Sequence, residues 1–359
     1  MKALRQLAAG MTLVVLSSGA AWAQAPSGQS TQPQPPPPPP SDSSDTRPAT
    51  TTVFGDTGLW YVPTGEVLPK GRWSFSAYRT NWDRKEAFTD ISNFRGTFAR
   101  FAVPEMERAL GSNNMYRAIN AVIVLSQLGS DRASNLLLLH VDQQNQAAWQ
   151  IRLRAAEGER LLLTGASLDA RKTLDAARKL RDAILREDNG LVLRSQLAAL
   201  DAADTTALTP PDRTTLRSLI GESIASVAQR AAAAAQVSGP MVTAMGSAVG
   251  TLRVRITTYA KNEQQSIGAQ LGPALGKMLE WARANWDDVK KDPLIDNDMR
   301  TFVAAAEGLL QFFDTVLVEG KRPAPTSDMR GAWDAGDKPK FETGVKAWQG
   351  VLDKAPYKP

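Results

Sequence analysis

The chain of 359 residues lacks cysteine and has a single histidine, His140. Without cysteine there is no disulfide bond and no thiol nucleophile, and a zinc site built from histidine and cysteine is excluded. A serine triad would have to use His140, which ends a run of four leucines and is expected to lie at the boundary of a core. We therefore expect no catalytic residue, no metal site and no cofactor.

Two short motifs resemble ligand-binding loops but lack residues that such loops require. Counting from Asp296, a calcium loop would have Arg300 at its fifth position, where a positive charge opposes metal binding. We expect the aspartates there to cap a helix that begins near Met299. The segment Gly272–Lys277 has too few residues between its glycines for a phosphate-binding loop, so a helix start is expected instead.

Long apolar runs are missing after the N-terminus, where no segment approaches the ~20 consecutive apolar residues of a membrane-spanning helix. The sequence therefore predicts no transmembrane helix. It contains 42 Lys and Arg against 37 Asp and Glu, and the two signs are interspersed. Because no basic stripe is present that could follow a phosphate backbone, nucleic-acid binding is not expected.

The first 23 residues have the three parts of a cleavable signal peptide. Lys2 and Arg5 form a positive region, and residues 7–16 form a short apolar stretch. The cleavage site and the expected new N-terminus are defined by Ala21, Ala23 and Gln24. The pattern predicts export to the periplasm or the outer membrane, with an uncleaved anchor helix as the alternative.

Residues 24–52 are expected to form a disordered, proline-rich linker. Nine of the chain's 22 prolines lie between residues 24 and 50, and Ser, Gln and Thr make up most of the rest. Such a composition cannot bury an apolar core. A ligand for a proline-recognising domain is the alternative interpretation.

Residues 53–102 are rich in aromatic side chains and predict a short β segment. Residues 72–77 alternate between polar and apolar, as a strand with one buried face requires. The expected aromatic anchors of this segment are Trp60, Tyr61, Trp73 and Phe75.

The same region carries a resemblance to a known class of proteins. Residues 54–66 (FGDTGLWYVPTGE), 71–76 (GRWSFS) and 88–91 (FTDI) resemble the N-terminal segment of bacterial outer-membrane β-barrel proteins. The resemblance covers residues 54–100. A closed barrel needs about eight or more strands, whereas the pattern that follows is helical. The resemblance implies either a leading barrel segment joined to a helical domain or a small soluble hairpin.

From residue 104 onward, apolar residues recur at spacings of three and four, which predicts a succession of helices. Within residues 112–205, an arginine followed four residues later by an alanine recurs at offsets of 35 and 42 residues. The residues of this repeat pattern are Arg117, Ala121, Arg152, Ala156, Arg194 and Ala198. With the sequence WQIRLRAA at 149–156, the pattern is similar to HEAT repeats, which implies stacked helix pairs over residues 104–208.

The repeat pattern fades at Thr209, and residues 209–320 are expected to form a bundle-like region. Residues 321–359 predict a loose tail with a last helix that docks on the body. The docking residues are Phe341, Val345, Trp348 and Leu352, which share one helical face. The predicted fold class is mainly α, either a HEAT-like α-solenoid or a helical bundle, preceded by an aromatic β-hairpin segment.

These patterns together predict an exported, non-enzymatic protein that binds another protein in the bacterial envelope. A structural or porin-like fragment associated with the outer membrane is one alternative, and it depends on residues 53–102. A hydrolase that uses carboxylates alone is another. It would need two acidic side chains that converge in an apolar cleft.

Overall fold

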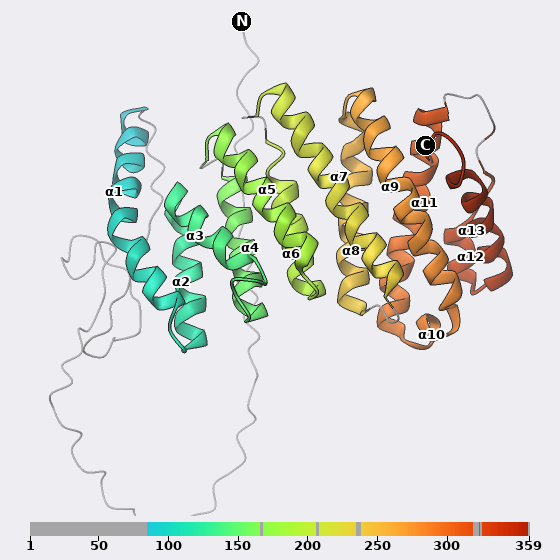
Figure 1. Cartoon of the computed structure of the whole chain (residues 1–359), viewed down its shortest axis with the longest axis horizontal. Coiled ribbons are helices and arrows are strands. Elements are labelled where there is room, and N and C mark those ends of the chain that lie inside the picture. The colour runs from blue at the N-terminus through green and yellow to red at the C-terminus, as the bar shows by residue number, and fades with distance from the viewer. Residues whose placement is uncertain are drawn as a thin grey trace, which may run out of the picture. The chain divides into compact units, whose positions relative to one another are not determined.

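The computed structural model describes residues 85–165, 168–205, 208–234, 238–318, 323 and 325–357, with side chains from residue 96 onward. Within these residues the protein is all α, with thirteen α-helices packed as a bundle and no strand (Figure 1). The mainly α prediction is therefore confirmed. The cleavage-site residues, the linker and the four aromatic anchors of the β segment lie outside the described residues; these are Ala21, Ala23, Gln24, 24–52, Trp60, Tyr61, Trp73 and Phe75.

The helices are α1 (Lys85–Leu110), α2 (Met115–Leu128), α3 (Asp131–Val141), α4 (Trp149–Thr164), α5 (Ala170–Arg186), α6 (Gly190–Ala202), α7 (Pro210–Ala233), α8 (Gly239–Arg255), α9 (Lys261–Ala284), α10 (Trp286–Lys291), α11 (Pro293–Val318), α12 (Met329–Ala335) and α13 (Lys338–Leu352). A single 3-10 turn, η1 (Ile256–Thr258), follows α8.

The helices form two layers. Helices α2, α4, α6, α8 and α11 contact one another in that order and make up the first layer. Helices α3, α5, α7, α9 and α13 contact one another in that order and make up the second layer. Figure 1 shows these pairs following one another along the helical body, from α2 to α11. Each helix pair therefore buries its apolar faces against the pairs before and after it.

Polar side chains determine where several of these helices begin. The N-caps of α3, α5 and α7 are Ser130, Asp169 and Thr209, and each side chain accepts a hydrogen bond from the backbone N–H three residues later. Each cap satisfies one of the N–H groups that a helix start leaves unpaired.

Helix α1 corrects the predicted extent of the β segment. Residues 85–102, which the aromatic composition assigns to strands, are helical. The buried residues Ala99, Ala102 and Met106 follow a helical spacing, and this apolar face packs on α2. Pro104 lies inside α1, and Figure 1 shows a bend partway along this helix. Proline removes a backbone donor and commonly kinks a helix in this way.

Helix packing continues across position 209, where the sequence places a boundary between two regions. Helix α5 contacts α7, and α6 contacts α8, across this position. The two helix starts expected from the motifs are wrong. Helix α11 begins at Pro293, where Asp292 accepts from two backbone N–H groups, and Gly272–Lys277 lies inside α9.

The C-terminal helix packs firmly on this body. The four predicted docking residues are all buried, and α13 contacts α9. Two glycines of α9 leave room for this contact, because a Cβ on Gly272 would meet Tyr357 and a Cβ on Gly276 would meet Leu352. Residues 325–357 are thus more closely packed than the predicted loose tail.

Among the described residues, α11 is the one helix whose length and apolar composition would allow it to cross a membrane. Of its most apolar stretch, 56% is buried inside the helical body. Phe302 and Phe313 are fully enclosed there, where α11 contacts α8 and α9. Packing in the core accounts for the apolar composition of this helix.

Candidate functional site

Three successive steps of the second layer are joined by the same kind of polar contact. In each step, a side chain in the last turn of one helix donates a hydrogen bond to the C-terminal end of the preceding helix in the same layer. The contacts are Arg186 to Asp142, Arg230 to the carbonyl of Ile184 at 2.7 Å, and Trp281 to the carbonyl of Ala234 at 3.2 Å. The partners are 44, 46 and 47 residues apart. The contacts to Ile184 and Ala234 satisfy carbonyl groups that helix ends leave unpaired, whereas Arg186 forms an ion pair with the Asp142 side chain; the three contacts recur once per helix pair.

The six residues of the predicted repeat pattern lie in α2, α4 and α6, which are neighbours in the first layer. Their environments differ. Ala121, Arg152 and Ala156 are buried, whereas Arg117, Arg194 and Ala198 are exposed. The pattern therefore falls on related helices but not on equivalent positions within them.

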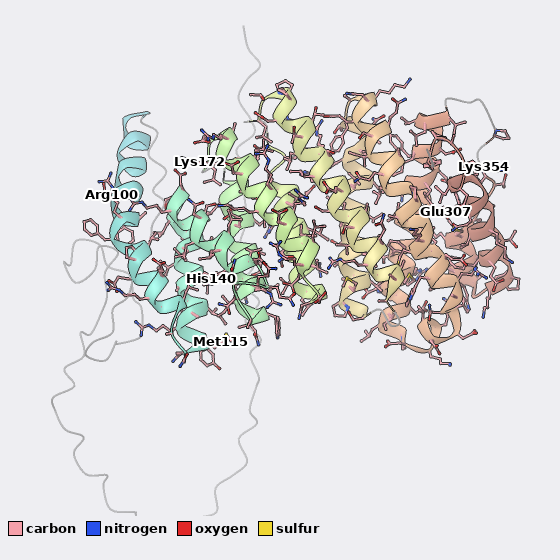
Figure 2. All side chains as sticks on the ribbon, viewed as in Figure 1. Arg100, Met115, His140, Lys172, Glu307 and Lys354 are labelled. Atoms are coloured by element: carbon pink, nitrogen blue, oxygen red, sulfur yellow. The ribbon has the colours of Figure 1, made fainter. Side chains whose placement is uncertain are left out.

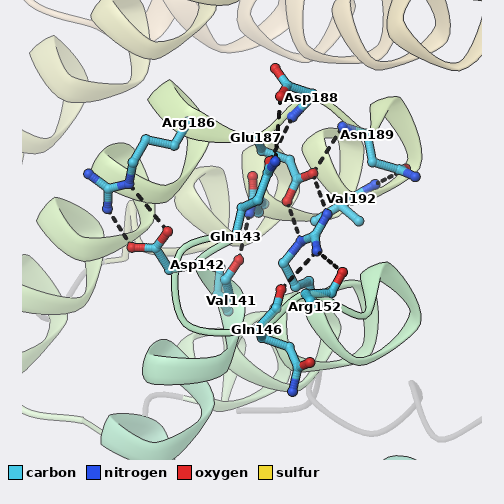
Figure 3. Close-up of polar contacts among 12 residues, drawn as sticks. Val141, Asp142, Gln143, Gln146, Arg152, Arg186, Glu187, Asp188, Asn189 and Val192 are labelled. Carbon is cyan, nitrogen blue, oxygen red and sulfur yellow. Dashed lines mark hydrogen bonds and ion pairs between the residues drawn. The ribbon is translucent and has the colours of Figure 1, made fainter. Parts of the chain in front are cut away.

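Arg152 and Glu187 form a buried ion pair between α4 and the C-terminal end of α5 (Figure 3). The Arg152 Nε–Glu187 Oε2 distance is 2.7 Å and the Nη2–Oε1 distance is 2.8 Å, while Nη1 donates to two backbone carbonyls. Glu187 Oε1 also accepts from the N–H of Asn189. The pair uses its hydrogen-bonding groups within the protein, so its role is structural.

Glu159 in α4 is the other deeply buried carboxyl in this region. The Ser134 hydroxyl donates to its Oε1 at 2.7 Å, and its Oε2 has no hydrogen-bond partner in the part of the chain that the structure describes. Burial raises the pKa of Glu159 to about 7. Although such a pKa suits an acid or base, the residue is 0% exposed, so a substrate in solvent would not reach its carboxyl group.

His140, labelled in Figure 2, lies in the last turn of α3 and is partly exposed. Its Nδ1 is 3.4 Å from the side-chain amide of Gln146, and burial lowers its pKa. Among the described residues, no group of three or more His, Cys, Asp and Glu side chains could hold a metal ion.

A groove of about 430 Å³ opens on the first layer between α6 and α8, with the end of α4 on one side and α7 beneath. Its walls carry small side chains, namely Ala198, Ala202, Ser247, Ala248 and Thr251. Apolar side chains of Leu197, Ile220, Ile224 and Leu252 line its base. Because the side chains on these two facing helices are small, they leave a space that a ligand could occupy.

The charges in the groove are unevenly matched. Asp201 pairs with Arg255 at 2.9 Å, and Asp204 pairs with Arg217 at 3.2 Å. The guanidinium groups of Arg160 and Arg194, which also line the groove, have no hydrogen-bond or ion-pair partner among the described residues. The two acids are therefore neutralised within the protein, whereas two positive charges remain available to a ligand.

The sequence patterns do not predict this groove, although they include two of its residues. Arg194 and Ala198 belong to the predicted repeat pattern. Arg194 has no acidic residue three or four positions away, which indicates that it forms no ion pair within its own helix. Arg160 has Glu157 three positions before it, but Glu157 pairs with Arg154 instead. No local pattern indicates that choice of partner.

The groove offers serine and threonine hydroxyls but no histidine, and both of its carboxylates are ion-paired. Its geometry is suited to holding a ligand through shape and charge. No family model matches the chain, and no curated protein and no solved structure matches it.

Proposed function

We propose that this chain is an exported helical-repeat protein of the bacterial envelope that acts by binding another protein, without a catalytic role. Its binding surface is the first-layer groove between α6 and α8. The observation that carries the proposal is this groove, which has walls of small side chains, an apolar base and two arginines without an ion-pair partner among the described residues. Export rests on the N-terminal signal pattern alone.

The helices from α2 to α11 form a HEAT-like α-solenoid in this proposal. Two features support it: the helices of each layer contact one another in chain order, and a polar contact recurs at steps of 44, 46 and 47 residues. In stacked repeats each unit contacts its neighbours, and the exposed helices of one layer form an extended surface for a partner. The repeat arrangement continues past Thr209, through α7, α8 and α9.

The proposal can be tested by selecting peptides from a random library on the full mature chain and then measuring their affinity for a groove-blocked variant. Ala198→Trp places a large side chain in the groove at an exposed position, so the helix should still fold. Selected peptides should bind this variant at least tenfold more weakly than the wild type.

Gln270→Trp is the matched control, because Gln270 is exposed on α9 in the second layer and does not line the groove. It should bind the peptides as the wild type does, and circular dichroism should show both variants folded. Peptides that bind the Ala198→Trp variant as tightly as the wild type would contradict a function based on this groove.

A further inference from the structure

We infer that the first-layer groove binds an extended, acidic segment of its partner protein, whose carboxylates pair with Arg160 and Arg194. This inference rests on the proposed function and adds the chemistry of the ligand. Both arginines are exposed and both line the groove, one from α4 and the other from α6. Because α4 and α6 are neighbours in the first layer, a single bound chain can contact both arginines.

The charge of the groove selects for an acidic ligand. Arg255 and Arg217 neutralise Asp201 and Asp204, so these acids neither repel a carboxylate nor offer a free site to a cation. A ligand carboxylate can form two parallel hydrogen bonds with an arginine, and such charge-assisted bonds are stronger than neutral ones. The unpartnered guanidiniums therefore favour carboxylates over neutral or basic side chains.

The shape of the groove favours an extended backbone. Its walls are made of Ala, Ser and Thr, which allow a main chain to approach closely, and its base carries Ile220 and Ile224. In an extended chain, successive side chains point to opposite sides. Acidic residues that alternate with small apolar or β-branched residues would direct one set to the arginines and the other to the base.

A single-stranded nucleic acid is the competing anionic ligand, and the groove is less suited to it. Proteins that bind such strands use aromatic side chains on which the bases stack. None of the groove-lining residues is aromatic. Two unpartnered arginines also provide far fewer phosphate contacts than a strand normally receives.

The inference is tested by fluorescence anisotropy with the full mature chain and a labelled twelve-residue peptide of alternating Glu and Thr. Threonine is β-branched and favours an extended conformation. The peptide should bind, and binding should weaken as NaCl is raised from about 50 to about 500 mM. Matched peptides with Gln or Lys in place of Glu should bind at least tenfold more weakly.

Arg160→Gln and Arg194→Gln should each weaken binding of the Glu-Thr peptide by about tenfold, and the double variant should weaken it further. Arg171→Gln is the matched control, because Arg171 is an exposed arginine of α5 in the second layer and does not line the groove. It removes the same charge and should leave binding unchanged.

Three outcomes would overturn the inference. In the first, the Glu and Gln peptides bind with equal affinity. In the second, Arg171→Gln weakens peptide binding as much as the two groove variants do. In the third, a twelve-nucleotide thymidine strand binds more tightly than the Glu-Thr peptide and depends on the same arginines. In each case, library peptides that still depend on Ala198 would leave the proposed function intact. Library peptides that ignore Ala198→Trp would reject the proposed function itself.

Discussion

Gly190 at the start of α6 packs directly against the backbone of Met241 at the start of α8. A Cβ atom on Gly190 would lie 2.4 Å from the Met241 nitrogen, which is shorter than any normal contact. Two adjacent helices of the first layer thus approach each other closely at a position where one of them has no side chain. Because the atoms in contact belong to the backbone, rotation of a side chain cannot relieve the overlap.

Replacing Gly190 with alanine should therefore force α6 and α8 apart and lower the free energy of unfolding by about 1–3 kcal/mol, the usual cost of overpacking. Gly250→Ala provides the control. Gly250 lies inside α8 with nothing within 4 Å of the position that a Cβ atom would take, so alanine should stabilise that helix by up to about 1 kcal/mol. Urea denaturation of both variants would check this, and equal effects of the two substitutions would contradict the close approach.

The buried Arg152–Glu187 pair leads to a second prediction. Arg152→Ala would leave Glu187 charged and buried without its partner, and the protein should lose about 3–5 kcal/mol of stability. Arg154→Ala, on the same helix, removes an exposed pair with Glu157 and should cost less than about 0.5 kcal/mol. Denaturant melts would measure both. Equal small effects of the two substitutions would contradict a buried ion pair between Arg152 and Glu187.

Local patterns in the sequence predict the helices well, because apolar spacing and capping residues act within a few positions. Ser130, Asp169 and Thr209 each stand directly before the helix that they cap. The aromatic residues after position 85 misled the prediction, since aromatic content favours strands, whereas the spacing of Ala99, Ala102 and Met106 is helical.

The layers and the groove could not be predicted in the same way. They depend on contacts between residues far apart in the chain, such as Arg186 with Asp142, and a single sequence does not show which pairs meet. The charge of the groove also depends on which arginine forms an ion pair with Glu157. Glu157 could reach Arg154 or Arg160, and only the structure shows that it pairs with Arg154.

The N-terminal signal pattern predicts that the exported chain begins at Gln24. Signal peptidase recognises the small residues Ala21 and Ala23, so the replacement Ala23→Arg should block cleavage. Mass spectrometry of the exported wild type should find a mature N-terminus at Gln24, whereas the variant should keep residues 1–23. An intact Met1 in exported wild-type material would show that the segment is not a cleaved signal.

Glu159 predicts a dependence of stability on pH that has the opposite sign to that of most ion-paired acids. Burial raises its pKa from 4.5 to about 7, so the folded state holds a proton that the unfolded state releases at lower pH. Between these values the unfolded state binds fewer protons, and stability falls as the pH rises. Above pH 7 the loss is complete and amounts to about 3 kcal/mol.

Glu159→Gln cannot ionise, yet its amide oxygen can still accept the hydrogen bond from Ser134. The variant should therefore match the wild type near pH 4 and exceed its stability near pH 8, by up to about 3 kcal/mol. Urea denaturation across this range would measure the difference, with Glu157→Gln on the same helix as the control. Glu263 is another acid whose pKa is shifted: burial opposes its ionisation, but hydrogen bonds from Thr214, the Ala260 N–H and Arg217 lower its pKa. Because Glu263 is present in both the wild type and the variant, its titration does not change the difference in stability between them. If Glu159 titrates in this window, the difference in free energy of unfolding between the variant and the wild type must change with pH. A difference that stays constant from pH 4 to pH 8 would therefore contradict the raised pKa of Glu159.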